Sequence, residues 1–124
     1  MIQTGQEIVY QRTFTAEDIE LFARVSGDEG MHHVAPDALG RIMVHGLLTA
    51  TLPTKIGGDM NYIARDINFV FERPVYAGDT VTCIVTLTQV EPADGMTRVI
   101  AEFVCRNQND KAVLTGSTHG IVRA

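Results

Sequence analysis

Alternating hydrophobic and polar residues predict five strands in this chain of 124 residues. The clearest pattern runs from Thr80 to Val90, where threonine alternates with valine, cysteine and leucine. Comparable patterns bounded by turn residues predict four more strands, over Glu7–Phe14, Asn61–Glu72, Met96–Arg106 and Lys111–Val122. The last four strands follow one another with only short connections, so we expect them to form a meander.

The strand predicted over Asn61–Glu72 carries large apolar side chains at every second position. Ile63, Ile67, Phe69 and Phe71 share one parity. Because successive side chains of a strand point to opposite faces, we expect these four on one face of the sheet.

Helical spacing marks two further segments. Thr15 is a suitable N-cap, Asp18 completes a capping box three residues later, and Gly27 should end this helix. The second segment, Ile42–Gly58, has almost no charge and closes on a glycine pair, which predicts a buried helix. Pro53 should kink this helix or tighten its last turn.

The order strand, helix, loop, helix and four strands predicts an α+β fold. Strands that follow one another form antiparallel sheets, and their apolar face needs a cover. The Ile42–Gly58 helix is the predicted cover. At this length, residues 1–124 should form one domain, and we expect a second copy of the chain to complete a substrate site.

Composition and charge exclude several classes of function. The net charge of −5 argues against nucleic-acid binding, which needs a basic surface. No apolar run approaches the roughly 20 residues that span a bilayer. The first five residues lack a basic head or an apolar signal core, so we expect a cytoplasmic protein. Cys83 and Cys105 lie in alternating apolar runs and should be reduced core thiols.

The segment Asp28–Met43 is too polar for a core yet joins two predicted helices, which is a common place for chemistry. It carries Asp28 and His33, the minimal pair for moving a proton or activating water near neutral pH. The spacing equally allows a turn capped by Asp28 beside a solvated pair, His32 and His33.

Metal binding is a third possibility for the same segment. Asp28, His32, His33 and Asp37 are oxygen and nitrogen donors. However, adjacent histidines point in different directions in most backbones, and no recognised ligand spacing is present. We therefore expect no metal.

A second feature is Val44-His45-Gly46, at the start of the predicted buried helix. A glycine lets a ligand approach the backbone, and free N–H groups of a first helical turn can hold a carbonyl oxygen that gains charge. A plain helix start, with Gly46 allowing close packing, fits equally well. His45 should be a hydrogen-bonded core or capping residue, and His119 structural or exposed.

Together these residues resemble the MaoC-like (R)-specific enoyl-CoA hydratases. The resemblance covers almost the whole chain, in the order Phe14-Thr15-Ala16-Glu17-Asp18, Ser26-Gly27-Asp28, His33, Val44-His45-Gly46-Leu47-Leu48, Phe71-Glu72-Arg73-Pro74-Val75 and Ala77-Gly78-Asp79-Thr80-Val81. It implies a hot-dog fold, in which an antiparallel sheet wraps a central helix. It also implies a homodimer or larger assembly with sites between subunits.

The resemblance assigns roles to four residues. Asp28 and His33 fall on the family's catalytic pair, Gly46 on the glycine whose N–H binds the thioester oxygen, and Thr54 on a helix position near the substrate. Two departures are Gly30 and Met31, which replace an asparagine and a proline. The segment between His33 and His45 is also short.

The implied activity is hydration of trans-2-enoyl thioesters, or the reverse dehydration of 3-hydroxyacyl thioesters, in fatty acid metabolism. Coenzyme A would be part of the substrate, and no separate cofactor is expected. Two alternatives are a hot-dog acyl-CoA thioesterase and a non-catalytic subunit that binds acyl thioesters. The absence of a carboxylate from Val44 to Gly58 counts against the first alternative, whereas Gly30 and Met31 support the second.

Overall fold

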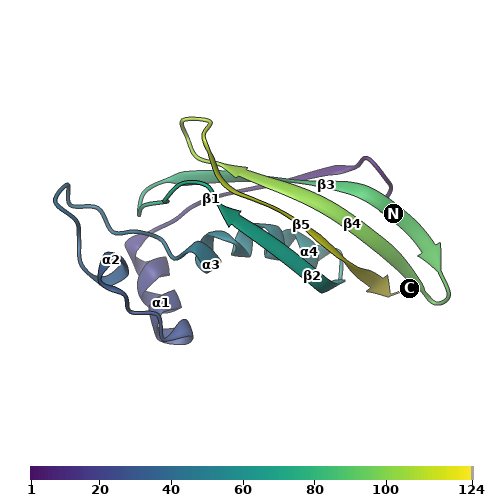
Figure 1. Ribbon diagram of the computed structural model, residues 1–124, viewed down its shortest axis with the longest axis horizontal. Helices are drawn as coiled ribbons and strands as arrows, with labels where there is room; N and C mark the ends of the chain where they lie inside the picture. The colour runs from purple at the N-terminus through teal and green to yellow at the C-terminus, as the bar shows by residue number, and fades with distance from the viewer. Residues whose placement is uncertain (124) are drawn as a thin grey trace.

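A five-stranded antiparallel sheet curves over a central helical segment, and two further helices lie beyond one end of the sheet (Figure 1). This computed structural model describes residues 1–123. The elements in chain order are β1 (Glu7–Thr13), α1 (Ala16–Ser26), α2 (Met31–Val34), α3 (Gly46–Thr49), α4 (Thr51–Asp59), β2 (Tyr62–Phe71), β3 (Thr80–Ala93), β4 (Met96–Arg106) and β5 (Ala112–Arg123).

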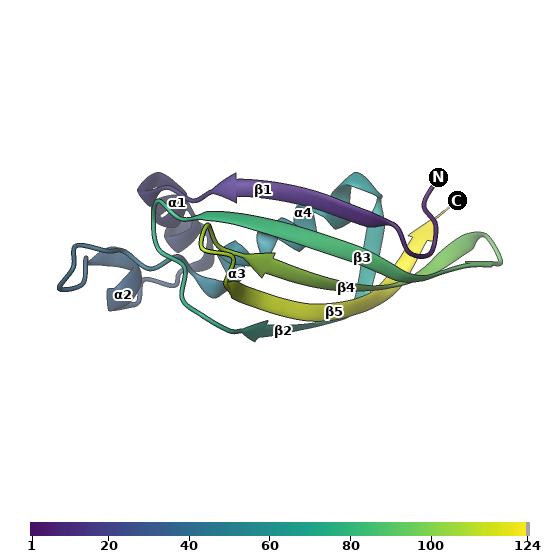
Figure 2. The same cartoon turned by 90° about the horizontal axis from the view of Figure 1, so that it is seen from above.

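The strand order in the sheet is β1-β3-β4-β5-β2, as the view from above shows (Figure 2). The five predicted strands are therefore present, but the predicted four-strand meander is wrong. Only β3, β4 and β5 form a meander. Because β1 occupies the outer side of β3 in antiparallel register, β2 pairs instead with the free side of β5. β2 is thus an edge strand.

A bulge in β2 also corrects the prediction that four apolar residues share one face. The pairing with β5 shifts between Ala64 and Asp66, which leaves Arg65 as the extra residue. One inserted residue reverses the side on which all later side chains lie. Ile67, Phe69 and Phe71 consequently share the face that carries the helix, whereas Ile63 pairs with Ile121 on the opposite face.

The predicted helix over Ile42–Gly58 begins four residues later than expected. Met43 forms a bridge with Tyr76, and the N–H of Val44 donates to the carbonyl of Val75 at 2.7 Å, so this stretch is extended. The helix is also interrupted at Ala50, between α3 and α4. Pro53 lies in the first turn of α4, where its missing N–H removes no helical hydrogen bond within that helix.

The helix α1 has the predicted ends. The Thr15 hydroxyl accepts from the N–H of Asp18 at 3.1 Å, and the Asp18 carboxylate accepts from the N–H of Thr15 at 3.0 Å. This backbone bond and the nearby Arg12 guanidinium lower the pKa of Asp18. Gly27 ends the helix with a left-handed φ of 76°. The polar segment Asp28–Met43 that follows contains the short helix α2.

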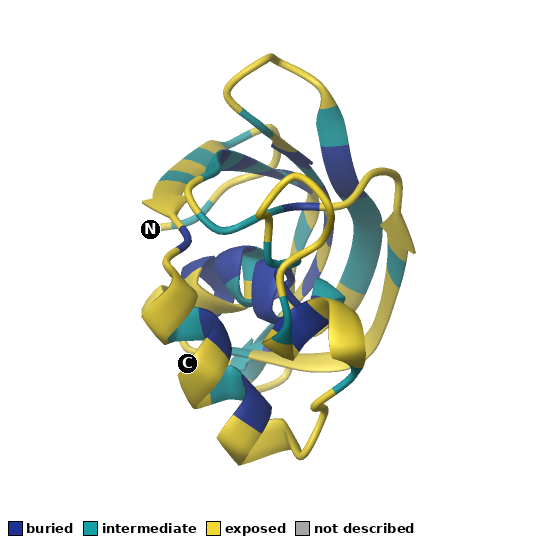
Figure 3. Ribbon diagram, turned by 90° about the vertical axis from the view of Figure 1, so that its left-hand side faces the viewer, coloured by how far each residue is buried: buried dark blue, intermediate teal, exposed yellow. Residues whose placement is uncertain are grey.

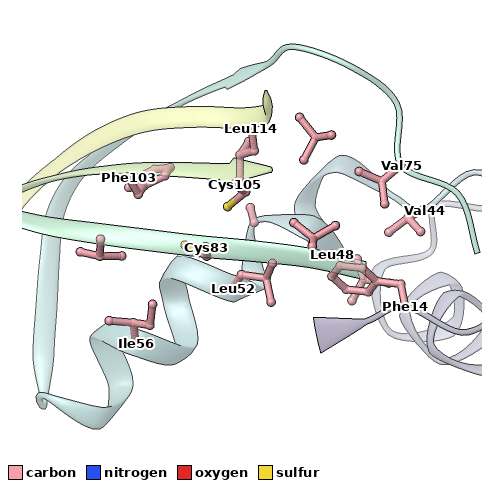
Figure 4. Close-up of a cluster of buried hydrophobic side chains, with 14 of the residues drawn as sticks. Phe14, Val44, Leu48, Leu52, Ile56, Val75, Cys83, Phe103, Cys105 and Leu114 are labelled. Carbon is pink, nitrogen blue, oxygen red and sulfur yellow. The ribbon is translucent and has the colours of Figure 1, made fainter. Parts of the chain in front are cut away.

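The core lies between the helical segment and the concave face of the sheet (Figure 4). Leu48, Leu52 and Ile56 of α3 and α4 are buried against alternate residues of β3, β4 and β5. Cys83 and Cys105 lie opposite each other on β3 and β4 and are free, buried thiols, as predicted. The helix therefore covers the sheet as the sequence indicated.

The cover is incomplete over β2, and most residues of α1 and α2 are exposed (Figure 3). Ile67 is 44% exposed and Phe71 is 53% exposed, although both lie on the helix-bearing face. Leu47 of α3 is also 60% exposed, so the helical segment is not buried on all sides as predicted. Among residues 1–123, no helix is both long and apolar enough to span a membrane.

Candidate active site

The end of helix α1 places Asp28 at the entrance of a cavity. Gly27 turns the chain, and the N–H of Asp28 donates to the hydroxyl of Ser26 at 3.0 Å. One carboxylate oxygen of Asp28, Oδ1, accepts from the N–H of Gly30 at 3.2 Å. Asp28 therefore caps a local turn. Its side chain remains 56% exposed, and its second carboxylate oxygen, Oδ2, faces the cavity.

His33 lies on helix α2 with its ring buried and held in one orientation. Its Nδ1 lies 2.8 Å from the backbone oxygen of Met43, which can only accept a hydrogen bond. Nδ1 therefore carries the proton of the neutral ring, and Nε2 carries a lone pair. Nε2 lies 3.7 Å from Oδ2 of Asp28. The structure thus brings together the two residues predicted as a catalytic pair.

His45 packs directly against this pair. Its ring stacks on that of His33 with centroids 3.8 Å apart and planes inclined by 17°. Its Nε2 lies 2.8 Å from the backbone oxygen of Asp28, so Nε2 donates there. His45 is 1% exposed and is the N-cap residue of α3. The prediction of a buried, hydrogen-bonded histidine is confirmed.

Gly46 begins helix α3 next to the same cavity. Its N–H has no acceptor among residues 1–123, as expected for the first residue of a helix. A Cβ at this position would lie 2.7 Å from Cε1 of Phe71, too close for any side chain without movement of that ring. The absence of a side chain therefore leaves the backbone N–H open to a ligand.

These residues surround a cavity of about 660 Å³ between the helices and the end of β2. The cavity walls combine the polar groups above with apolar side chains of α1, α3 and the segment after β2. Its lining includes Phe22, Asp28, His32, His33, His45, Gly46, Leu47, Phe71, Arg73 and Val75. A volume of this size and mixed lining suit a small-molecule ligand.

Thr54, the fourth predicted site residue, does not line this cavity. Its hydroxyl donates to the carbonyl of Ala50 within its own helix at 2.8 Å. The residue instead lines a second, mostly apolar cavity of about 280 Å³ between α4 and β2, with Tyr62 and Phe69. Within one chain, the structure therefore separates Thr54 from the other three predicted residues, and its role stays a prediction.

Gly30 stands where the resembling family has asparagine, and the structure shows what occupies the space. A Cβ at Gly30 would lie 3.0 Å from Cε1 of His32 and 3.4 Å from Oδ1 of Asp28. The exposed His32 ring therefore lies against Gly30 and lines the cavity beside His33.

Asp28, His33 and His45 offer three possible metal-ligand atoms within 4.8 Å of one another. A ring nitrogen binds a metal through a lone pair in the plane of the ring. Nearly parallel rings 3.8 Å apart cannot both direct such a lone pair at one ion without large distortion. The arrangement is therefore poorly suited to a metal, and we assign none.

The chain belongs to the MaoC-like domain family. Residues 1–106 match the family described as "MaoC like domain". This match covers most of the chain, including the cavity residues of α1, α2 and α3.

Two relatives with assigned activities are similar to the chain. An (R)-specific enoyl-CoA hydratase of Rhodospirillum rubrum is 33% identical over 102 residues, which cover 73% of this chain and 69% of the relative. A mitochondrial 3-hydroxyacyl-[acyl-carrier-protein] dehydratase of Arabidopsis thaliana is 25% identical over 132 residues, which cover 98% of this chain and 78% of the relative.

A similar fold is found in the (R)-hydratase from A. caviae involved in PHA biosynthesis. The TM-score is 0.86 with 24% sequence identity, and the match covers 99% of this chain and 98% of that one. The fold is therefore a hot-dog fold, as the sequence resemblance implied.

Sequence reasoning did not foresee two contacts in the site. The stacking of His45 on His33 joins residues that are 12 positions apart in the chain, and the Phe71 ring reaches Gly46 of α3 from the end of β2. The sequence did single out His45, directly before Gly46, but it gave no indication that the partner of His45 is His33. No local pattern pointed to the second contact.

Proposed function

We propose that this protein catalyses the (R)-specific hydration of trans-2-enoyl thioesters and the reverse dehydration of 3-hydroxyacyl thioesters. One observation carries the proposal: the free Nε2 of His33 and a carboxylate oxygen of Asp28 lie 3.7 Å apart beside the open N–H of Gly46. The two relatives support both directions, because one is a hydratase and the other a dehydratase.

In the hydration direction, a water molecule binds between Asp28 and His33. Nε2 of His33 takes a proton from this water because its lone pair faces the cavity. The resulting hydroxide attacks the β-carbon of the enoyl group, and the electron pair of the double bond moves through the α-carbon to the carbonyl oxygen. General acid–base catalysis of this type contributes roughly 10²–10⁴-fold in rate.

The attack produces an enolate, whose oxygen carries the negative charge. The N–H of Gly46 donates a hydrogen bond to this oxygen, and a donor of this kind contributes about 10²–10³-fold. The proton then passes from the Asp28–His33 pair to the α-carbon. Water is thereby added across the double bond, and the residues return to their starting state.

The first experiment is to mix the protein with crotonyl-CoA and follow the enoyl absorbance and the free thiol together. We expect loss of the enoyl signal without thiol release, and (R)-3-hydroxybutyryl-CoA as the product. Asp28→Asn should reduce kcat/KM by roughly 10²–10⁴-fold. Glu29→Gln is the matched control, because Glu29 is an adjacent exposed carboxylate that does not line the cavity.

Three outcomes would contradict the proposal. Thiol release would show a thioesterase. Binding of acyl-CoA without change in either signal, over several chain lengths, would show a binding subunit. Full activity of the Asp28→Asn variant would show that the reacting groups lie elsewhere.

We also propose that the protein is a homodimer joined through β2. β2 is an edge strand of ten residues that pairs only with β5 among the described strands. Ile67 and Phe71 are large apolar residues that remain about half exposed on this strand. An exposed edge of this kind is a template for pairing with another strand, and a second copy would cover it.

The expected cytoplasmic location stays a prediction.

A further inference from the structure

We infer that His45 is a positioning residue for the Asp28–His33 pair, holding the backbone at Asp28 and the ring of His33 at once. This inference rests on the proposed function, because it gives His45 a part in the same reaction. His45 does not itself face the proton that is transferred in that reaction.

The hydrogen bond to Asp28 supports the first part of the inference. A backbone oxygen only accepts, so the 2.8 Å contact fixes the proton of His45 on Nε2. The bond joins the start of α3 to the turn after α1, across 17 positions of the chain. Among the described residues, His45 is the one hydrogen-bond donor to the Asp28 carbonyl. His45 therefore holds this side of the turn, while the Asp28 N–H and Oδ1 are held by Ser26 and Gly30.

The stacked ring supports the second part. The edge of the His33 ring is held by the carbonyl of Met43, and its face is held by the ring of His45. Residues 43–45 thus fix the direction in which Nε2 of His33 points. Phe22 packs against His45 with ring centroids 4.9 Å apart and limits its movement in turn.

The second nitrogen of His45 indicates which charge state the site needs. Nδ1 is buried and has no hydrogen-bond partner among the described residues. A proton placed there would have no acceptor, and it would put a second positive ring against His33 when His33 takes its proton. A neutral His45 instead presents its π face to the protonated His33 ring, which is a favourable contact.

The other charged or titratable side chains that line the cavity with His33 lie in three segments of the chain. Asp28 follows α1, His32 lies on α2, and Glu72 and Arg73 follow β2 on the cavity wall.

Two variants of His45 separate the two contacts. His45→Gln retains a hydrogen-bond donor near the position of Nε2 but no ring, and His45→Phe retains a ring but no donor. Because small displacements of reacting groups cost about 10²-fold, we expect each variant to lower kcat for crotonyl-CoA by roughly 10- to 100-fold with KM changed less than about threefold. His119→Gln, a change of an exposed histidine on β5, is the matched control.

A measurement on the unaltered protein tests the geometry independently of turnover and of variant folding. Long-range ¹H–¹⁵N NMR should show His45 protonated on Nε2 with a bare Nδ1, and His33 protonated on Nδ1. His45 protonated on Nδ1 would overturn the inference. The inference would also be overturned if either folded variant kept kcat within twofold, or if the variants raised only KM. A wild-type protein with these tautomers but no hydratase activity would refute the proposed function and leave the positioning geometry in place.

Discussion

Gly46 is the residue at which an added methyl group should affect the site most directly. In Gly46→Ala, the new Cβ would overlap the Phe71 ring at 2.7 Å, and that ring is free to swing because it is 53% exposed. The fold should survive with a loss of about 1 kcal/mol in the free energy of unfolding. The methyl group and the displaced ring would crowd the N–H, so kcat/KM should fall roughly 10²–10³-fold.

Steady-state kinetics with crotonyl-CoA and a urea titration check this prediction together. A variant that is stable but retains full kcat/KM would show that the Gly46 N–H does not bind the developing charge. A variant that unfolds would show that the Phe71 ring cannot move aside.

The two thiols of the core give a prediction that is independent of function. A hydrogen bond with Cys83, followed by burial, raises the pKa of Cys105 far above that of a free thiol. The thiolate is the reactive form, and both side chains are fully buried, so neither cysteine should react with Ellman's reagent at pH 8 in the native protein. Both should react in guanidinium chloride. Rapid reaction of either thiol in the native protein would contradict the buried arrangement.

At the scale of elements, two glycines should respond to alanine in opposite ways. A Cβ at Gly116 of β5 would overlap the backbone oxygen of Asn68 and come within 2.6 Å of the Phe103 ring. Gly116→Ala should therefore push β2 away from β5 and lower the free energy of unfolding by about 1–3 kcal/mol. A Cβ at Gly58 of α4 would meet nothing within 4 Å.

Gly58→Ala should accordingly stabilise the protein by roughly 0.5–1 kcal/mol, because alanine loses less backbone freedom than glycine on entering a helix. Denaturant titrations of both variants measure the two changes. Equal effects of the same sign would show that the close approach of β2 to β5 is not what requires Gly116.

The elements also show where local patterns stop being informative. Residues of α1 fix its start and end through contacts within a few positions of the chain, so the sequence predicted both. The start of the central helix depends instead on Val44 donating to Val75, a partner 31 positions away. The composition of the segment gave no sign of that partner. The reversal of face in β2 likewise follows from a bulge that the alternating pattern did not reveal.

At the scale of the whole molecule, the exposed face of β2 leads to a prediction about assembly. The protein should have twice the chain mass of 13.6 kDa in solution. Ile67→Lys would place a charge on the half-exposed apolar surface of β2 and should shift the protein towards the monomer. Ile100→Lys is the control, because Ile100 is similarly exposed at 40% but lies on β4.

Sedimentation velocity of the three proteins at several concentrations measures this shift. A monomeric wild-type protein would refute the proposed dimer. A dimer that Ile100→Lys disrupts and Ile67→Lys does not would place the interface on the outer face of the sheet.

The sequence by itself determined the five strands, the capped helix α1, the apolar helix under the sheet and the catalytic candidates Asp28, His33 and Gly46. These features follow from hydrophobic periodicity and from contacts between near neighbours, which a linear sequence records. The tertiary structure alone decided that β2 lies at the edge, that the Phe71 ring fills the space where a side chain of residue 46 would lie, and that His45 stacks on His33. Each of these depends on which distant segments meet, and that is set by how the whole chain buries its apolar surface and pairs its backbone.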